Sequence, residues 1–268
     1  MPKTTEKPTR IIAFVNHKGG VGKTTTVLNV AAGLHIRGRS VLMVDMDAQA
    51  NLTTSVGLSQ EEDNTIYDVL TRKKSLLEII KPCSNGTFIA PSSLDMATLA
   101  EQFASGNVLR REEILKYALE EVANDYDYIL IDCAPSLDIT TKNALSAASD
   151  AYVPVSAEFL PTKGLTSIID ILTNIRRNRI NPNINITGII TTRFQKSRAI
   201  CQDVHDSLIA QFGEVVFKTT IRENTSITES PAYSKDIFEY KRSSLGATDY
   251  MKLVDEILAR ETSLLPTN

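Results

Sequence analysis

Short apolar runs without polar alternation set the strongest limit on the fold of this chain. The run YDYILID at residues 126–132 and the run VLMVD at residues 41–45 show the pattern. Strands that are apolar on both faces are typical of a parallel sheet covered by helices on both sides. On this basis we predict strands at residues 11–15, 41–45, 87–91, 126–132, 151–155, 184–192 and 214–217.

Stretches of helical length separate most of these runs. Asp138 or Ser136 could cap the helix that ends near Ala148, and Gly213 follows Phe212 as a helix stop. The alternation of strands and helices predicts one doubly wound α/β domain, with a mostly parallel sheet flanked by helices. The predicted helices are residues 24–37, 94–104, 109–123, 137–148, 163–179, 197–212 and 246–261.

Composition excludes several classes of protein. The 268 residues are 42% hydrophobic and carry a net charge of −3, which allows a sizeable core and excludes a globally basic nucleic-acid binder. Cys83, Cys133 and Cys201 have no C-x-x-C spacing, so neither a disulfide framework nor a zinc site is expected. The first residues, MPKTTEKPTR, do not resemble a signal peptide, and no run of 18 apolar residues occurs. We therefore expect a cytoplasmic protein.

The segment VNHKGGVGKTTT, which follows the first predicted strand, comes within one residue of the phosphate-binding pattern G-x-x-x-x-G-K-[ST]. His17 stands where the first glycine would be, and an additional lysine, Lys18, follows it. Gly19, Gly20 and Gly22 allow successive backbone N–H groups to form an anion nest at the start of a helix.

The residues that end this segment suit the phosphates of a nucleotide and its magnesium ion. Lys23 would reach the β- and γ-phosphates, Thr24 offers a hydroxyl to Mg²⁺, and Thr25 can hydrogen-bond an α-phosphate. A glycine-rich turn that binds no ligand is the alternative. The flanking strand and helix favour the phosphate site.

Carboxylates stand at the ends of two other predicted strands. Asp132 ends a strand expected beside the strand of the glycine loop, while Asp45 and Asp47 lie two residues apart on one side. A buried carboxylate needs a partner, and a metal or its hydration shell would supply one. Each aspartate could instead cap the helix that follows.

Three motifs in order, KGGVGKTT, DMDAQANLT and ILIDCAPS, resemble the ParA/Soj branch of the deviant Walker A ATPases, whose superfamily includes MinD. The likeness covers nearly the whole chain, and IRENTSITESPAYSKDIFEY resembles the ParA-type segment that ends in E-[AS]-P-x-x-x-K. The resemblance implies a P-loop ATPase domain at residues 11–268 behind a flexible tail at residues 1–10, with ATP and Mg²⁺ as cofactors.

The resemblance also implies roles for individual residues. Lys18 matches the signature lysine, which reaches across a nucleotide-sandwich dimer to the partner's phosphates as a catalytic and binding group. Asp47 matches the residue that orients the attacking water. Asp132 would hold Mg²⁺ through its water shell, with Asp45 supporting the metal side. Gly20 matches the glycine whose small size lets two subunits approach.

The remaining nucleotide contacts are implied in the same way. Val21 belongs to the phosphate loop, and the loop after the strand at residues 184–192, with Arg193, would line the adenine. Ile221, Arg222 and Asn224 would line it from a second segment.

The resemblance implies an ATP-dependent dimerisation switch that binds DNA non-specifically and segregates a plasmid or chromosome with a ParB-like partner. Ten residues before the first strand cannot hold a helix-turn-helix domain, so the short Soj-like type is expected. Ser226 stands where many such proteins have a basic residue, so part of the basic surface is absent or relocated. The candidate DNA contacts are Lys196, Arg198, Lys235, Lys241 and Arg242, with Arg193 and Arg222 as further candidates, and each could instead be an ordinary solvated charge.

Two alternatives belong to other functional classes. A MinD-like membrane switch needs a basic amphipathic C-terminal helix, but the amphipathic stretch in DYMKLVDEILARETSLLPTN is acidic. An iron–sulfur relative needs cysteines that bridge a dimer, and Cys133 has no matching pair. The resemblance therefore favours a DNA-binding switch without a membrane anchor.

Overall fold

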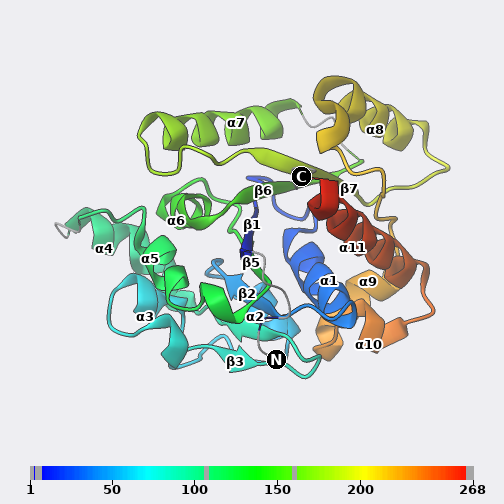
Figure 1. Cartoon of the computed structure of the whole chain (residues 1–268). Coiled ribbons are helices and arrows are strands. Elements are labelled where there is room, and N and C mark those ends of the chain that lie inside the picture. The colour runs from blue at the N-terminus through cyan, green and yellow to red at the C-terminus, as the bar shows by residue number, and fades with distance from the viewer. Residues whose placement is uncertain (1–2, 4–7, 106–108, 159–161, 264–268) are drawn as a thin grey trace.

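The computed structural model describes residues 3, 8–105, 109–158 and 162–263. In this part of the chain one sheet has the strand order β3-β4-β2-β5-β1-β6-β7 (Figure 1). Every neighbouring pair is parallel except β3 with β4, so the predicted mostly parallel sheet is confirmed. The strands are β1 (Arg10–Phe14), β2 (Val41–Asp45), β3 (Lys81–Pro82), β4 (Phe88–Ala90), β5 (Tyr128–Asp132), β6 (Asp150–Ser156) and β7 (Ile186–Thr192).

Helices cover both faces of the sheet (Figure 1). The α-helices are α1 (Lys23–Ile36), α2 (Asn51–Ser55), α3 (Ile66–Leu70), α4 (Leu99–Ser105), α5 (Ile114–Glu120), α6 (Ile139–Ala147), α7 (Thr162–Arg177), α8 (Ala199–Phe212), α9 (Thr225–Glu229), α10 (Ile237–Lys241) and α11 (Leu245–Ser263). Short 3-10 helices are η1 (Leu76–Glu78), η2 (Leu94–Thr98), η3 (Ala123–Asp125), η4 (Gly213–Val215) and η5 (Ser230–Tyr233).

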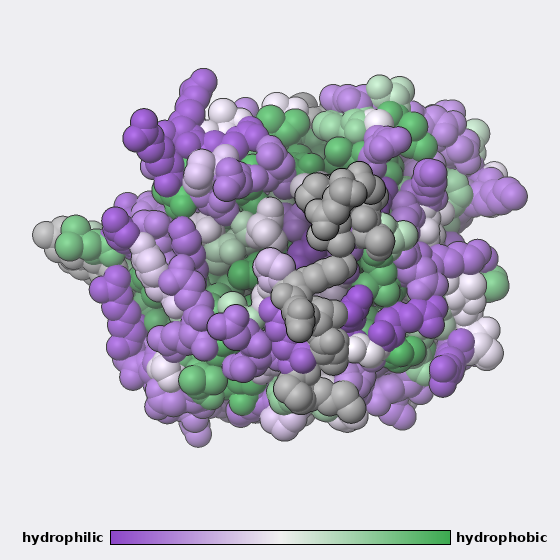
Figure 2. Space-filling view, in the orientation of Figure 1, coloured by the Kyte–Doolittle hydropathy of each residue, from purple (hydrophilic) through white to green (hydrophobic). Residues whose placement is uncertain are grey.

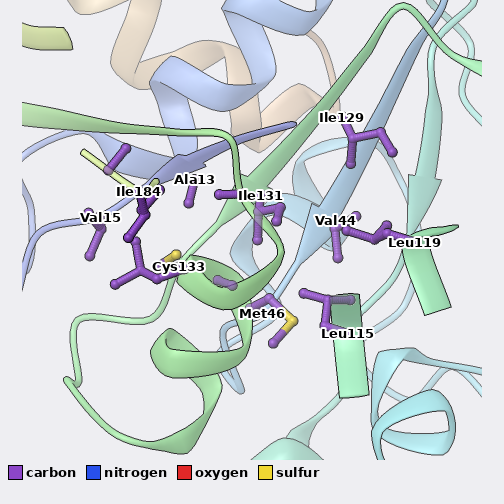
Figure 3. Packing of buried hydrophobic residues seen from close by; sticks show 14 of the residues in the cluster. Ala13, Val15, Val44, Met46, Leu115, Leu119, Ile129, Ile131, Cys133 and Ile184 are labelled. Atoms are coloured by element: carbon purple, nitrogen blue, oxygen red, sulfur yellow. The ribbon is translucent and has the colours of Figure 1, made fainter. Parts of the chain in front are cut away.

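The central strands place apolar side chains on both sides of the sheet, which explains why their sequences do not alternate. On β1, Ala13 faces one core cluster, whereas Ile12 and Phe14 face the other. Figure 3 shows the first cluster, in which Ala13 and Val44 lie with residues of α5. A helix layer on each face is therefore required to cover the sheet.

Helix α1, which begins at the glycine loop, packs beside α11 (Figure 1). Leu253, Val254 and Ile257 of α11 are fully buried in the same core cluster as α1. Within the described part of the chain, none of the helices combines the length and apolar character needed to traverse a bilayer. Figure 2 shows hydrophilic residues over most of the visible face, with hydrophobic ones scattered among them.

Several predicted segments differ from the structure: the helix predicted at residues 109–123, for example, spans only Ile114–Glu120. Residues 214–217 do not form a strand: η4 occupies Gly213–Val215, and only Val216 makes an isolated bridge, to Ile189. Gly213 ends α8, as predicted, with a φ of 59°, and the chain continues from it as η4. Strand β1 begins at Arg10, inside the predicted tail, and residues 1–2 and 4–7 of that tail lie outside the described residues.

Gly33 sets how closely α1 approaches α11. A Cβ at this position would lie 2.7 Å from Cγ2 of Val254. Although alanine favours a helix by about 1 kcal/mol over glycine, we expect Gly33→Ala to lower the free energy of unfolding by about 1–3 kcal/mol through overpacking. Urea unfolding followed by circular dichroism measures it. In a Val254→Ala background the same substitution should lose this cost, and a stabilising effect in the natural background would contradict the packing argument.

Candidate functional site

The glycine loop connects β1, near the centre of the sheet, to the first turn of α1. Gly20 and Gly22 have φ values of 73° and 85°, in the left-handed region that glycine adopts without strain. Gly22 is the N-cap of α1 and supplies no side-chain cap to the described helix. Backbone N–H groups at the start of α1 are thus left for an anion.

Asn16 holds the beginning of the loop. Its side-chain amide donates to the carbonyl oxygen of Pro154 at 2.8 Å, and its Oδ1 accepts the backbone N–H of Lys18 at 3.0 Å. Asn16 is buried, so these bonds attach the loop to β6 at a site where water competes little.

The two lysines of the loop lie in different environments. Lys23 is 7% exposed, and its Nζ donates to the carbonyl oxygen of Lys18 at 3.4 Å. Burial lowers the pKa of Lys23, although the nearby carboxylates of Asp132 and Asp47 favour its charged form. The side chain of Lys18 is exposed. The loop therefore keeps one cation inside its own site and presents the other at the surface.

Asp45 and Asp132 end the adjacent strands β2 and β5 and are partners in the strand register. Asp45 is fully buried, and its oxygens accept hydrogen bonds from the Thr53 N–H (2.9 Å), the Thr53 hydroxyl (2.8 Å) and the Asp47 N–H (3.1 Å). Burial raises the pKa of Asp45 to about 6 against these hydrogen bonds. The protein itself therefore already satisfies the carboxylate of Asp45 with hydrogen bonds.

Asp132 differs sharply from its neighbour. It is 1% exposed, and neither carboxylate oxygen has a hydrogen-bond partner among the described residues. Burial, and next the charge of Asp45, raise the pKa of Asp132 well above its ordinary value. The Thr24 hydroxyl and the charge of Lys23 lower the pKa of Asp132, although the hydroxyl does not meet the geometry of a hydrogen bond. The site therefore holds an acceptor without a donor.

The other predicted phosphate-side residues differ in their burial. Asp47 lies beyond β2, half-buried, with Oδ1 accepting the N–H of Gln49 at 3.0 Å. Thr24 and Thr25 are half-buried in the first turn of α1. Gly19 is exposed, and Val21 is buried beneath the loop. Within the described ranges, no three His, Cys, Asp or Glu side chains cluster as a metal cage.

The segment predicted to line the adenine joins the end of β7. Ile221 donates its N–H to the carbonyl oxygen of Thr191 at 2.8 Å, and its own carbonyl accepts the N–H of Phe194 at 3.0 Å. Arg193, with a φ of 50°, is exposed, and its guanidinium lies 3.5 Å from Glu158. The structure thus brings the two predicted segments side by side.

The remaining two residues of that prediction have internal partners. Arg222 forms a two-point ion pair with Asp249 of α11, at 2.6 and 2.7 Å, which raises the pKa of Arg222. Asn224 caps α9, where its Oδ1 accepts the N–H of Ser226 at 3.0 Å. Their side chains therefore hold the segment in shape, and their adenine contacts stay a prediction.

The candidate DNA contacts fall into two groups. Lys196 and Arg198 are exposed in the connection from β7 to α8, where Arg198 lies 3.9 Å from Glu158. The second group, around α10, is also exposed: Lys235, Lys241 and Arg242.

Sequence reasoning missed two threonines that shape the site. Thr53 provides two of the hydrogen bonds to Asp45, and Thr192 donates its hydroxyl to the carbonyl oxygen of Val21 in the loop at 2.8 Å. Thr53 ends the DMDAQANLT motif, which is the one sequence signal that pointed to it. Thr192 has no such local signal, since only the fold brings the end of β7 to the loop.

A parallel sheet whose central strand leads through a glycine loop into a helix, with a buried lysine and aspartates beside it, defines a P-loop nucleotide-binding fold of the ATPase type. The family described as an AAA domain matches residues 9–186. The chain is 34% identical to the chromosome partitioning protein ParA of Caulobacter vibrioides, over 95% of this chain and 96% of that protein. It is 35% identical to the chromosome-partitioning ATPase Soj of Treponema pallidum, over 94% and 98%.

Among solved structures, cobyrinic acid a,c-diamide synthase from Mycobacterium smegmatis with bound ADP and magnesium superposes with a TM-score of 0.83. That protein is 28% identical, and the match covers 95% of this chain and 96% of that one. The chain therefore belongs to the ParA/Soj family of the ParA/MinD superfamily of P-loop ATPases.

The unpartnered carboxylate of Asp132 should weaken the nucleotide-free protein. We expect Asp132→Asn to raise its free energy of unfolding by about 1–3 kcal/mol, because a neutral amide costs less to bury than an unpaired charge. Asp45→Asn is the matched control and should destabilise, since an amide NH₂ would face the donors that now reach Asp45. Chemical denaturation at neutral pH compares the two. A loss of stability in both variants would contradict the difference in partners.

Proposed function

We propose that this chain is an ATP-dependent dimerisation switch with weak ATPase activity, which partitions plasmid or chromosomal DNA. In this proposal the ATP-bound dimer binds DNA without sequence preference, and a ParB-like partner stimulates hydrolysis. The names of the Caulobacter and Treponema relatives support a partitioning role. Binding to DNA would place the ATP-bound form on the nucleoid.

The different burial of the two loop lysines carries the proposal. Lys23 lies inside the loop and serves as the cation for its own nucleotide. Lys18 is exposed, beside Gly19 and Gly20, where an added Cβ would meet no atom within 4 Å. That open surface leaves room for a second subunit, and a cation delivered across the interface would stabilise the charge on its phosphates.

The residues present fit a magnesium–nucleotide complex. Asp132 has two buried oxygens without a partner among the described residues, and Thr24 places a hydroxyl beside them. Asp132 and Thr24 would hold the magnesium ion and its water shell. Asp45 would support them from behind, because its own oxygens already accept hydrogen bonds from Thr53 and Asp47. Bound magnesium would neutralise phosphate charge during transfer.

Asp47 is the residue that we assign to the attacking water. It lies past the end of β2, half-buried, and contributes to the field at Lys23 rather than pairing with it. A carboxylate there can orient water and accept its proton. Its role is therefore in the transition state, and nucleotide binding rests on the loop.

The structure offers little for the two alternatives. A MinD-like anchor needs an exposed apolar face, but Tyr250, Leu253 and Ile257 of α11 are at most 1% exposed, with α1 against them. A cluster that bridges a dimer needs a thiol at the surface of each subunit, and Cys133 is 1% exposed. The apolar side of α11 is thus part of the core, and DNA binding is the better proposal.

The assigned roles predict opposite effects for two variants. Asp47→Ala should keep nucleotide affinity while the turnover number falls by about 10²-fold, and the protein should accumulate as an ATP-bound dimer. Lys18→Ala should bind ATP as a monomer, because the cross-subunit cation is removed. Multi-angle light scattering with ATP and Mg²⁺ decides the point. A monomeric Asp47→Ala together with a dimeric Lys18→Ala would refute both assignments.

DNA binding should require ATP and depend steeply on salt. Each phosphate that the protein neutralises releases counterions, so log affinity should fall linearly with log salt concentration. Replacing Lys241 and Arg242 by alanine should weaken binding equally on all duplexes and make the salt dependence shallower, by about one in slope for each cation that binds a phosphate. Fluorescence anisotropy over a range of salt concentrations measures both effects.

The control for this experiment removes the same charge elsewhere. Arg177 and Arg179 are exposed at and beyond the end of α7, and their double alanine variant should bind DNA as the natural protein does. Strong preference for one duplex over scrambled DNA of equal length would contradict the proposal.

A further inference from the structure

Thr192, the last residue of β7, contacts the phosphate loop directly. Its hydroxyl donates to the carbonyl oxygen of Val21 at 2.8 Å and also lies 3.2 Å from the carbonyl oxygen of Val155. A hydroxyl has one proton, so the shorter contact to Val21 is the stronger one. Thr192 is 3% exposed, and water does not compete for the bond.

The bond acts on a peptide of the loop that its neighbouring glycine leaves adjustable. Val21 stands between Gly20 and Gly22, whose φ values are 73° and 85°. Glycine crosses between backbone regions at little cost, so the peptide that joins Val21 to Gly22 could rotate. In a trans peptide the C=O and the N–H point in opposite directions. Holding the Val21 carbonyl toward β7 therefore aims the N–H of Gly22 away from β7.

We infer that Thr192 is a positioning residue of the phosphate site, which fixes the Val21–Gly22 peptide so that the N–H of Gly22 faces a bound phosphate. The inference rests on the proposed nucleotide binding and adds a residue that the P-loop pattern does not contain. The nest needs preformed N–H groups, because an anion that must first order them binds less tightly.

The position of Thr192 also joins the phosphate loop to the opposite side of the site. Its carbonyl accepts the N–H of Ala157 at 2.9 Å, and the carbonyl of its neighbour Thr191 accepts the N–H of Ile221 at 2.8 Å. The same strand end thus holds the loop and the segment assigned to the adenine. A shift of this strand end would move both.

The test compares Thr192→Val, which removes the hydroxyl at nearly constant volume, with Thr192→Ser, which keeps it. Calorimetric titration with Mg·ADP should show the dissociation constant rising about tenfold in Thr192→Val, as expected when one hydrogen bond is removed, and staying near the natural value in Thr192→Ser. With ATP, KM should rise similarly while kcat at saturation changes little, because the contact is made to ground and transition states alike.

Thr187→Val is the matched control. Thr187 lies near the other end of β7, and its hydroxyl donates to Oδ1 of Asp150 at 2.6 Å, away from the loop. This control substitution should lower the melting temperature by an amount similar to that of Thr192→Val and leave nucleotide affinity unchanged.

The possible outcomes separate the inference from the proposed function. Failure of the natural protein to bind Mg·ADP or Mg·ATP would overturn the proposed function itself. Normal binding by the natural protein with equal affinities in Thr192→Val and Thr187→Val would overturn the role of Thr192 alone. If Thr192→Val does not fold, Thr192→Ala replaces it, and natural affinity in that variant would overturn the inference equally.

Discussion

The register of the three central strands is the constraint on which the site depends. β1, β2 and β5 run parallel and end together, with Asp45 opposite Asp132 and the glycine loop leaving the strand between β5 and β6. A shift of one residue would turn each side chain to the other face of the sheet. The apolar residues on both faces prevent that shift, since it would exchange the contents of two filled cores. Core packing therefore positions the charges.

The fold and the phosphate side of the site could be predicted because their signals are local. Apolar runs, the glycine–lysine segment and the strand-end aspartates are each contained in a dozen residues or fewer. The predicted strand at residues 214–217 is wrong for the same reason: its valines look like a strand, but α8 ends on Gly213 and the chain continues as η4. Helices of five residues, such as α2 and α9, are too short to show a helical period and cannot be predicted from one.

Partners that lie far apart in sequence could not be predicted either. The resemblance assigns Arg222 to the nucleotide, yet its guanidinium is held by Asp249 on α11, and Thr192 reaches Val21 across 171 positions of the sequence. Which of several uses a polar side chain serves is decided by tertiary contacts.

Shared architecture also limits what the fold can say about function. The Mycobacterium smegmatis synthase has a TM-score of 0.83 with this chain although its name denotes a different activity. The sheet and the loop therefore identify nucleotide chemistry, and the task that uses it depends on the surface. In the proposed function, the exposed Lys18 and the exposed basic residues around α10 are the surface features that would distinguish this chain.

Asp45 and Asp132 differ in their hydrogen-bond partners, and this difference bears on how a bound cation would change the stability of the fold. Asp45 is stabilised by its own chain, whereas Asp132 is buried without a donor among the described residues. Any cation that satisfies Asp132 in the folded state alone adds its binding free energy to the stability of the fold. Asp45, the register partner of Asp132, ends β2 ahead of α2, and α2 packs against η5, which in turn contacts α10. Packed elements therefore join the two aspartates to the basic residues around α10.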